Sequence, residues 1–232
     1  MSGIGDIEVV GRSTAEQVAD GLGNLILDGS MRPGERISEA GIARTLSLSR
    51  NTVREALRLL QGSGLVRYSF NRGLVVWDPT DEDIVEVFRA RLYLERLAAT
   101  SLRKNTDLSG VEAAHATFEQ ALESADARTI VETDLAIHQA IVATLGSSRL
   151  DTFYAGLMVE LRYFLVLLSL DRREYEDTGP VRSEHRDLVE AFASRSPKRA
   201  VAAVTALLEE NRELVRDVIA RRVADSAGTG GG

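Results

Sequence analysis

The sequence of 232 residues contains no cysteine and only four prolines. Without cysteine the chain can form no disulfide, no thiolate nucleophile and no cysteine-ligated zinc site, which suits a reducing compartment. Residues 1–10 lack the basic start and the apolar stretch of a signal peptide. The most apolar run, Phe164 to Leu168, is far shorter than a bilayer requires. We therefore expect a soluble cytoplasmic protein with no membrane partner.

The chain lacks an excess of positive charge: its 28 basic side chains are outnumbered by 35 acidic ones, so the formal net charge is −7 at pH 7. Its distribution is uneven. Residues 31–73 carry eight arginines and three acids, which leaves +5, whereas residues 74–232 carry 19 basic and 27 acidic side chains, which leaves −8. A basic segment on an acidic body favours one local contact with nucleic acid, because the rest of the chain is repelled from phosphate.

Apolar spacings of three and four residues dominate the sequence and predict a mainly α fold. Ser13 and Glu16 form a capping-box pattern before a helix that we expect to bury Val18, Leu22, Leu25 and Ile26 and to end at Gly29. Ser38 is expected to begin a short helix carrying Ile42, Ala43 and Leu46, and Ser49 caps another helix. Residues 65–69 and 74–77 are β-prone runs around the turn 70–73. Residues 1–78 are thus predicted to form a winged helix-turn-helix domain.

Residues 79–224 are predicted to form an all-helical effector-binding and dimerisation domain, a bundle of about six helices. The expected helices are 80–104, 108–124, 127–145, 150–171, 180–195 and 197–224. Residues 225–232, which are rich in glycine, are predicted to form a disordered tail.

The helix that follows Ser49 has two different faces. Val53, Ala56, Leu57 and Leu60 share an apolar face. Opposite them lie Arg50, Arg54 and Arg58 at i, i+4 and i+8, with Asn51 and Thr52 in the first turn. Arginine can bond guanine through two atoms and asparagine can do the same with adenine, so this face fits a reader of the major groove. We expect Glu55 to face away from DNA or to pair with a neighbouring arginine. The alternative is an ordinary surface helix with solvated arginines, but the preceding short helix and the hairpin favour the winged module.

The N-terminal segment closely resembles the GntR family of regulators. The matching segments are 26–29, 32–37, 42–43, 48–50, 53–57, 64–66 and 71–73. The resemblance implies that most operator contacts are made by Arg50, Asn51, Thr52 and Arg54, with Arg44 on the DNA backbone and Asn71, Arg72 and Gly73 at the wing. Ser49 and Arg58 of the same helix complete the predicted DNA-binding residues. It also implies a homodimer that reads two half-sites. Asn51-Thr52 stands where the family commonly has Thr-Pro.

The remainder resembles the FCD effector domain of the FadR-like branch, through segments 91–95, 98–99, 134–138 and 184–185. Many members bind a divalent metal, here Zn or Ni, through one aspartate and three histidines beside a carboxylate effector. The resemblance implies Asp134, His138 and His185 as metal ligands, with Leu207 where a third histidine would stand. Glu210 and Asn211 lie a turn further on and can substitute for it, or water and the effector can fill the position. The alternative is that both histidines are hydrogen-bonded core residues and no metal binds.

Two arginines, Arg91 and Arg162, match basic positions that face the family's pocket. The resemblance implies that they bind a small organic-acid effector. The alternative is that each pairs with a carboxylate such as Glu95 or Glu160.

Three functions remain open. The first is a ligand-responsive DNA-binding regulator that is not an enzyme. The second is a metal-dependent enzyme using the Asp134, His138 and His185 cluster, although the sequence lacks a nucleophile elbow, a phosphate-binding glycine loop and an HExxH motif. The third is an architectural DNA-binding protein, which predicts a fully packed bundle rather than a polar pocket around His138 and Arg162.

Overall fold

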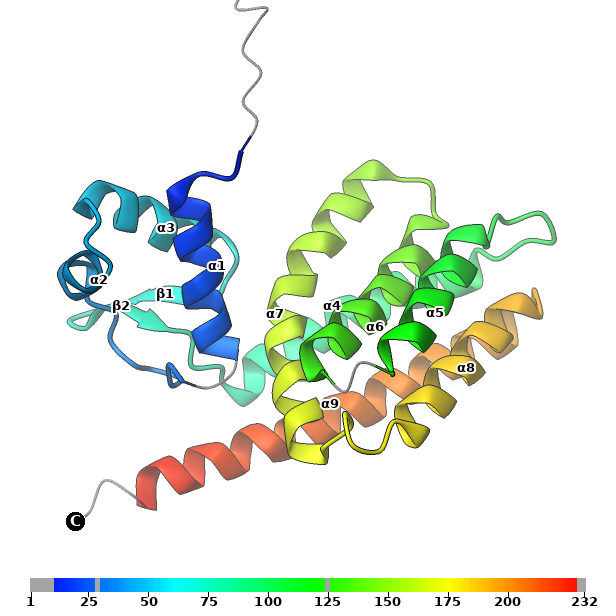
Figure 1. The fold of residues 1–232 in the computed structure, drawn as a ribbon. Helices are drawn as coiled ribbons and strands as arrows, with labels where there is room; N and C mark the ends of the chain where they lie inside the picture. Colours follow the sequence, from blue (N-terminus) through cyan, green and yellow to red (C-terminus); the bar gives the residue numbers. More distant parts are fainter. Residues whose placement is uncertain (1–10, 28–29, 124–125, 229–232) are drawn as a thin grey trace, which may run out of the picture. The chain divides into compact units, whose positions relative to one another are not determined.

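The computed structural model describes residues 11–27, 30–123 and 126–228 (Figure 1). The chain divides into two compact units, Met1–Asp78 and Pro79–Gly232. Helices dominate both units, and a small antiparallel sheet belongs to the first. The predicted mainly α fold, with a winged helix-turn-helix followed by a helical domain, is confirmed.

The N-terminal unit contains α1 (Thr14–Leu27), α2 (Glu39–Thr45) and α3 (Arg50–Gly62). Each begins where the sequence places a serine cap. Ser13 Oγ accepts a hydrogen bond from the Glu16 amide while the Glu16 carboxylate accepts one from the Ser13 amide. Ser38 and Ser49 cap α2 and α3 in the same way, through amides of their first turns. The expected end of the first helix at Gly29 lies outside the described residues.

The core of this unit differs from the prediction at one leucine. Leu25 is 42% exposed, so its predicted burial is wrong, and Leu46, expected on the short helix, is 47% exposed. The reason is that α1 buries a face of small and large residues, Ala15, Ala19, Leu22 and Ile26, where it packs on α3. Leu25 lies at the border of this face, and Leu46 follows the last residue of the short helix α2.

The wing is the hairpin of β1 (Val66–Ser69) and β2 (Gly73–Val76), which pair antiparallel with Val66 opposite Val76. The segment 34–37 runs along the other edge of β2, where the Ile37 amide donates to the Leu74 carbonyl and the Val76 amide donates to the Glu35 carbonyl. The tight loop requires left-handed backbone, with φ of 64° at Asn71 and 78° at Gly73. The hairpin is therefore anchored to the rest of the domain through the edge of β2 that does not pair with β1.

The C-terminal unit gathers six helices, visible as one bundle in Figure 1. They are α4 (Asp81–Thr100), α5 (Ser109–Ala121), α6 (Ala127–Ala143), α7 (Ser148–Arg172), α8 (Gly179–Ala193) and α9 (Pro197–Gly228). Helix α9 packs along α4 and α8, while α6 packs between α5 and α7. Helix α9 continues to Gly228, into the segment expected to be a disordered tail, because each residue added to an existing helix gains a backbone hydrogen bond.

Within α7 the span Ser148–Ser169 is long and apolar enough to cross a membrane by length and composition alone. However, 56% of its most apolar window is buried inside the unit, as in the core helix of a bundle. The short apolar run recognised in the sequence is only part of this helix.

The anchoring of α3 can be tested at two leucines of that helix. Leu57 is 1% exposed and Leu59 is 44% exposed. We expect Leu57→Ala to lower the free energy of unfolding of the N-terminal unit by about 2 to 5 kcal/mol, because it leaves a cavity in the core. Leu59→Ala is the matched control and should change it by less than about 0.5 kcal/mol. Urea unfolding followed by circular dichroism measures both, and equal effects would contradict the assigned orientation of α3.

Candidate DNA-binding surface and candidate metal centre

Helix α3 presents the two faces that its sequence predicts. Val53, Ala56 and Leu57 are buried, whereas Arg50, Arg54 and Arg58 are exposed on the other side. Ser49 Oγ accepts the Thr52 amide at 3.1 Å and lies 2.9 Å from the Thr52 hydroxyl, so these two side chains fix the first turn. The backbone of the first turn of α3, from which the exposed face begins, is therefore held in place.

The three arginines of this face differ in their contacts. Arg54 donates two hydrogen bonds to Glu39 of α2, from Nη2 at 2.7 Å and from Nε at 3.2 Å, and still leaves 50% of its side chain exposed. The hydrogen bonds from Arg54 lower the pKa of Glu39, and Glu39 raises the pKa of Arg54. Arg50 and Arg58 make no hydrogen bond or close ion pair within the described part of the chain, although the charge of Arg50 also helps to lower the pKa of Glu39. Sequence reasoning missed Glu39, and no arginine of the described segments pairs with the exposed Glu55.

At the wing, Arg72 donates from Nη2 to the Gly34 carbonyl at 2.5 Å, so its guanidinium is held against its own domain. Asn71 remains exposed at the loop, and Arg44 is exposed in the last turn of α2. The hairpin also exposes an aromatic side chain that the sequence analysis did not single out, Phe70, at 84%.

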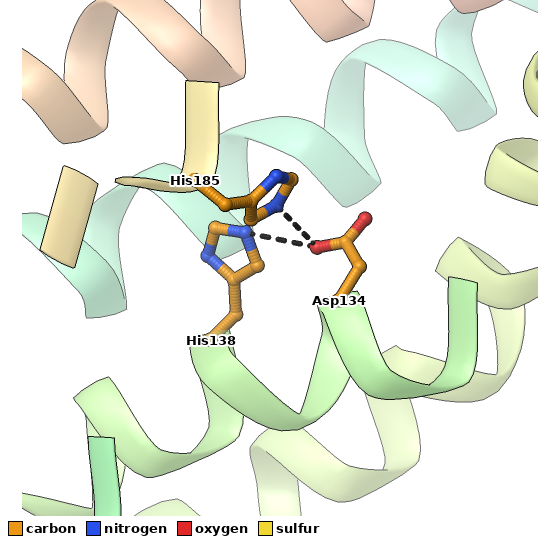
Figure 2. Close-up of side chains that lie close together, drawn as sticks. All are labelled: Asp134, His138 and His185. Carbon is orange, nitrogen blue, oxygen red and sulfur yellow. Dashed lines mark hydrogen bonds and ion pairs between the residues drawn. The ribbon is translucent and has the colours of Figure 1, made fainter. Parts of the chain in front are cut away.

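The second site is a buried cluster of Asp134 and His138 from α6 and His185 from α8 (Figure 2). One carboxylate oxygen, Asp134 Oδ1, lies 2.9 Å from His185 Nε2 and 3.2 Å from His138 Nε2. One ligand atom from each residue lies within 4.8 Å of the other two. The fold thus brings all three predicted metal ligands together.

The Nδ1 atoms of both imidazole rings, which face away from Asp134, are already hydrogen-bonded to other groups of the protein. His185 Nδ1 donates to the Val181 carbonyl at 2.8 Å, and His138 Nδ1 lies 2.7 Å from Glu95 Oε2. Among the described residues the polar contact of the buried His138 Nε2 is the 3.2 Å ion pair with Asp134 Oδ1, which lacks the geometry of a hydrogen bond. Histidines that ligate metals commonly donate their other N–H to a carboxylate or a backbone carbonyl, which turns the remaining lone pair inward. Two imidazoles and a carboxylate arranged in this way fit a divalent cation such as Zn²⁺.

Protons are the alternative occupants of this cluster. Burial alone would lower the pKa of His185, but the neighbouring Asp134 carboxylate raises it above its usual value. Burial would likewise raise the pKa of Asp134, but the two imidazoles lower it instead. A positive charge between these groups is therefore favoured, whether a proton or a metal ion supplies it.

Glu95 of α4 is the junction of a wider hydrogen-bond network. Its Oε1 accepts from Arg91 Nε at 2.8 Å and from the Tyr154 hydroxyl at 2.6 Å. Burial opposes its ionisation, but His138 and Arg91 lower the pKa of Glu95 to about 2. Sequence reasoning named Glu95 only as a possible partner of Arg91, because nothing local signals its contacts with α6 and α7.

The two arginines predicted to bind an effector lie in different surroundings. Arg91 is fully buried and pairs with Glu95, and its Nη1 and Nη2 have no hydrogen-bond partner within the described segments. Arg162 is 41% exposed and its Nε lies 4.0 Å from Glu132. The structure does not bring Arg162 into the Glu95 network.

A small polar cavity adjoins the cluster of Asp134, His138 and His185, here called the metal-type cluster. Its polar walls are Asp134, Glu174, Glu184, His185 and Asn211. Its volume of about 10 Å³ accommodates about one water molecule. Burial raises the pKa values of Glu174 and Glu184. The bundle is thus not packed solely with apolar side chains, but the polar space lies beside Asp134 and His185 and not around Arg162.

Both units match known protein families. Residues 14–76 match the bacterial regulatory proteins of the gntR family, and residues 86–210 match the FCD domain. An uncharacterised HTH-type transcriptional regulator of Bacillus subtilis, YdhC, is 26% identical over 85% of this chain and 89% of its own length. The gluconate operon transcriptional repressor of Bacillus subtilis is 26% identical over 89% of this chain and 86% of its own length.

Among solved structures, a putative transcriptional regulator GntR from Rhodococcus sp. RHA1 is 28% identical, with a TM-score of 0.73 over 89% of this chain and 99% of that one. McbR/YncC of E. coli shares the fold, with a TM-score of 0.63 at 20% identity. The chain therefore belongs to the GntR family of DNA-binding transcription regulators and carries an FCD domain.

Proposed function

We propose that this chain is a ligand-responsive regulator that binds operator DNA as a homodimer in the bacterial cytoplasm. The observation that carries the proposal is the exposed basic face of α3 above a fully buried apolar face. Arg50 and Arg58 make no close ion pair in the described part of the chain, so they can contact bases or phosphates without breaking one. Two such domains in a dimer would read two half-sites.

The other DNA contacts follow from the same geometry. Asn51 lies beside Arg54 in the first turn of α3, and Arg44 and Asn71 are exposed. Ser49 and Thr52 present hydroxyls at the helix start, and Gly73 permits the wing loop. Arg72 must leave the Gly34 carbonyl to reach DNA, so we assign it the smaller role.

We further propose that Asp134, His138 and His185 hold one divalent metal, Zn or Ni, which would supply a fixed positive charge for a carboxylate-bearing effector. His138 Nε2, whose contact with Asp134 is not a well-formed hydrogen bond, and the Nη1 and Nη2 of Arg91, which lack hydrogen-bond partners among the described residues, support this assignment. Because the cavity accommodates about one water, an effector can enter only if the surrounding helices separate. That movement is the proposed source of the coupling to operator affinity. The family and the relatives are transcription regulators, and we assign the cluster no catalytic role.

The DNA-binding proposal can be tested by selection from a random duplex library. We expect the protein to enrich a motif with two half-sites. Arg50→Ala and Arg54→Ala should each weaken binding to the selected duplex by about 1 to 3 kcal/mol, because each removes a base contact. The matched control is Arg149→Ala, which removes an exposed arginine of the C-terminal unit and should leave the affinity unchanged. Gel shifts measure all three, and wild-type affinity in both α3 variants would refute the assignment.

The metal proposal can be tested with the three histidines of the chain. The wild type, freed of metal and then dialysed against ZnCl₂ or NiCl₂, should retain about one ion per chain, and His138→Ala should retain far less, because the site loses one of its three ligands. His115→Ala is the control, because His115 lies outside the cluster. Elemental analysis gives the stoichiometry. Equal retention in the wild type and His138→Ala would count against the site.

The Glu95 network predicts a further effect on stability. Tyr154→Phe keeps the ring but removes the hydroxyl that donates to Glu95, so we expect the free energy of unfolding to fall by about 1 to 3 kcal/mol. Tyr93→Phe is the matched control, because Tyr93 is 66% exposed. Urea denaturation measures both. The network would be shown to be unimportant for folding if the two variants proved equally stable.

A further inference from the structure

Helix α9 carries three residues that the sequence places near the cluster of Asp134, His138 and His185. The structure gives these three residues different surroundings. Leu207 is buried in the apolar core, packed among hydrophobic residues of the bundle. Glu210 is exposed. Asn211 is only 6% exposed and lines the same small cavity as Asp134 and His185. Asn211 is therefore the residue of α9 that lines the cavity beside Asp134 and His185.

No hydrogen bond joins the Asn211 side chain to the described part of the chain, although an amide offers two donors and one acceptor oxygen. The residue lines the cavity instead, so its amide is available to a water or an ion held there. The cavity that it lines has room for about one such body.

The other polar walls of the cavity are already engaged. Arg172 lies 3.3 Å from Glu174 through Nη1 and 3.9 Å from Glu184 through Nη2. Their carboxylates thus share one arginine, whereas Asn211 has no such contact. Asn211 is the wall residue that remains available to a ligand of the cavity.

We propose that Asn211 completes the Asp134, His138 and His185 centre through its amide oxygen and thereby sets the metal preference of the site. The inference rests on the proposed metal function. An oxygen in place of a third imidazole gives the centre a carboxylate, two imidazoles and an amide oxygen. Carbonyl and carboxylate oxygens suit Mn²⁺ better than Zn²⁺, so Asn211 contributes more to the binding of Mn²⁺. Zn²⁺ is commonly held by three protein ligands and a water, so it depends less on Asn211.

The test uses calorimetric titrations of the full chain with MnCl₂ and, separately, with ZnCl₂. Asn211→Leu removes the oxygen while keeping the branching and the number of heavy atoms of the side chain, and should weaken Mn²⁺ binding about tenfold or more, with a smaller effect on Zn²⁺. Asn211→Asp restores an oxygen ligand and should retain Mn²⁺ binding. Glu209→Ala, which alters an exposed residue of the same helix away from the cavity, should leave both affinities unchanged. Thermal unfolding without metal shows that each variant is folded.

The outcomes separate this inference from the metal proposal itself. If the wild type and Asn211→Leu bind both metals equally, Asn211 is not a ligand, while the three-residue centre stands. If Asn211→Leu loses both metals to the same extent and Asn211→Asp restores neither, the residue only supports the fold, and the inference fails. If the wild type binds neither metal, both proposals fail.

Discussion

The FCD bundle depends on the ionised carboxylate of Glu95, which is completely buried. Such a charge is tolerated in an apolar interior only when it is paired and hydrogen-bonded. Arg91, His138 and Tyr154 supply those bonds from α4, α6 and α7, and the contact of Asp134 with His185 extends the network to α8. One polar chain thus joins four helices. The same bonds fix the His138 ring, so the stability of the bundle and the geometry of the metal-type cluster have a common origin.

This arrangement constrains how the domain can respond to a ligand. The cavity beside the cluster accommodates about one water, and the hydrogen-bond donors of Arg91 that lack partners are fully buried. An organic acid that paired with Arg91 would therefore have to part the helices that the Glu95 network holds together. A tightly packed bundle with unpaired polar groups inside can exist in two conformations, closed and opened. A ligand that forms hydrogen bonds with those groups favours the opened conformation. In the N-terminal unit the core of α3 and the pair of Arg54 with Glu39 keep the DNA-binding face preformed.

Local sequence patterns predict those features of the structure that depend only on residues close together in the sequence, such as helix caps and helix faces. The caps at Ser13 and Ser49 were predictable because capping needs only a few consecutive residues. The shared face of Asp134 and His138 follows from helical spacing. The Glu39 partner of Arg54 could not be read in this way, because the two residues are 15 positions apart and meet only when α2 packs on α3. Arg162 was assigned to the pocket by resemblance alone, and the structure places it beside Glu132 at the surface.

The most direct test of the buried centre is the protonation of its histidine rings, observed by two-bond ¹⁵N–¹H NMR before and after addition of ZnCl₂. The chain has three histidines, so each can be assigned by one substitution. With Zn²⁺ present, His138 and His185 should carry the proton on Nδ1 and show metal-shifted Nε2 signals, because Glu95 and the Val181 carbonyl hold the Nδ1 sides. His115 should not change. Unaltered ring signals for His138 and His185 on addition of Zn²⁺, or protons on their Nε2 atoms, would contradict the account.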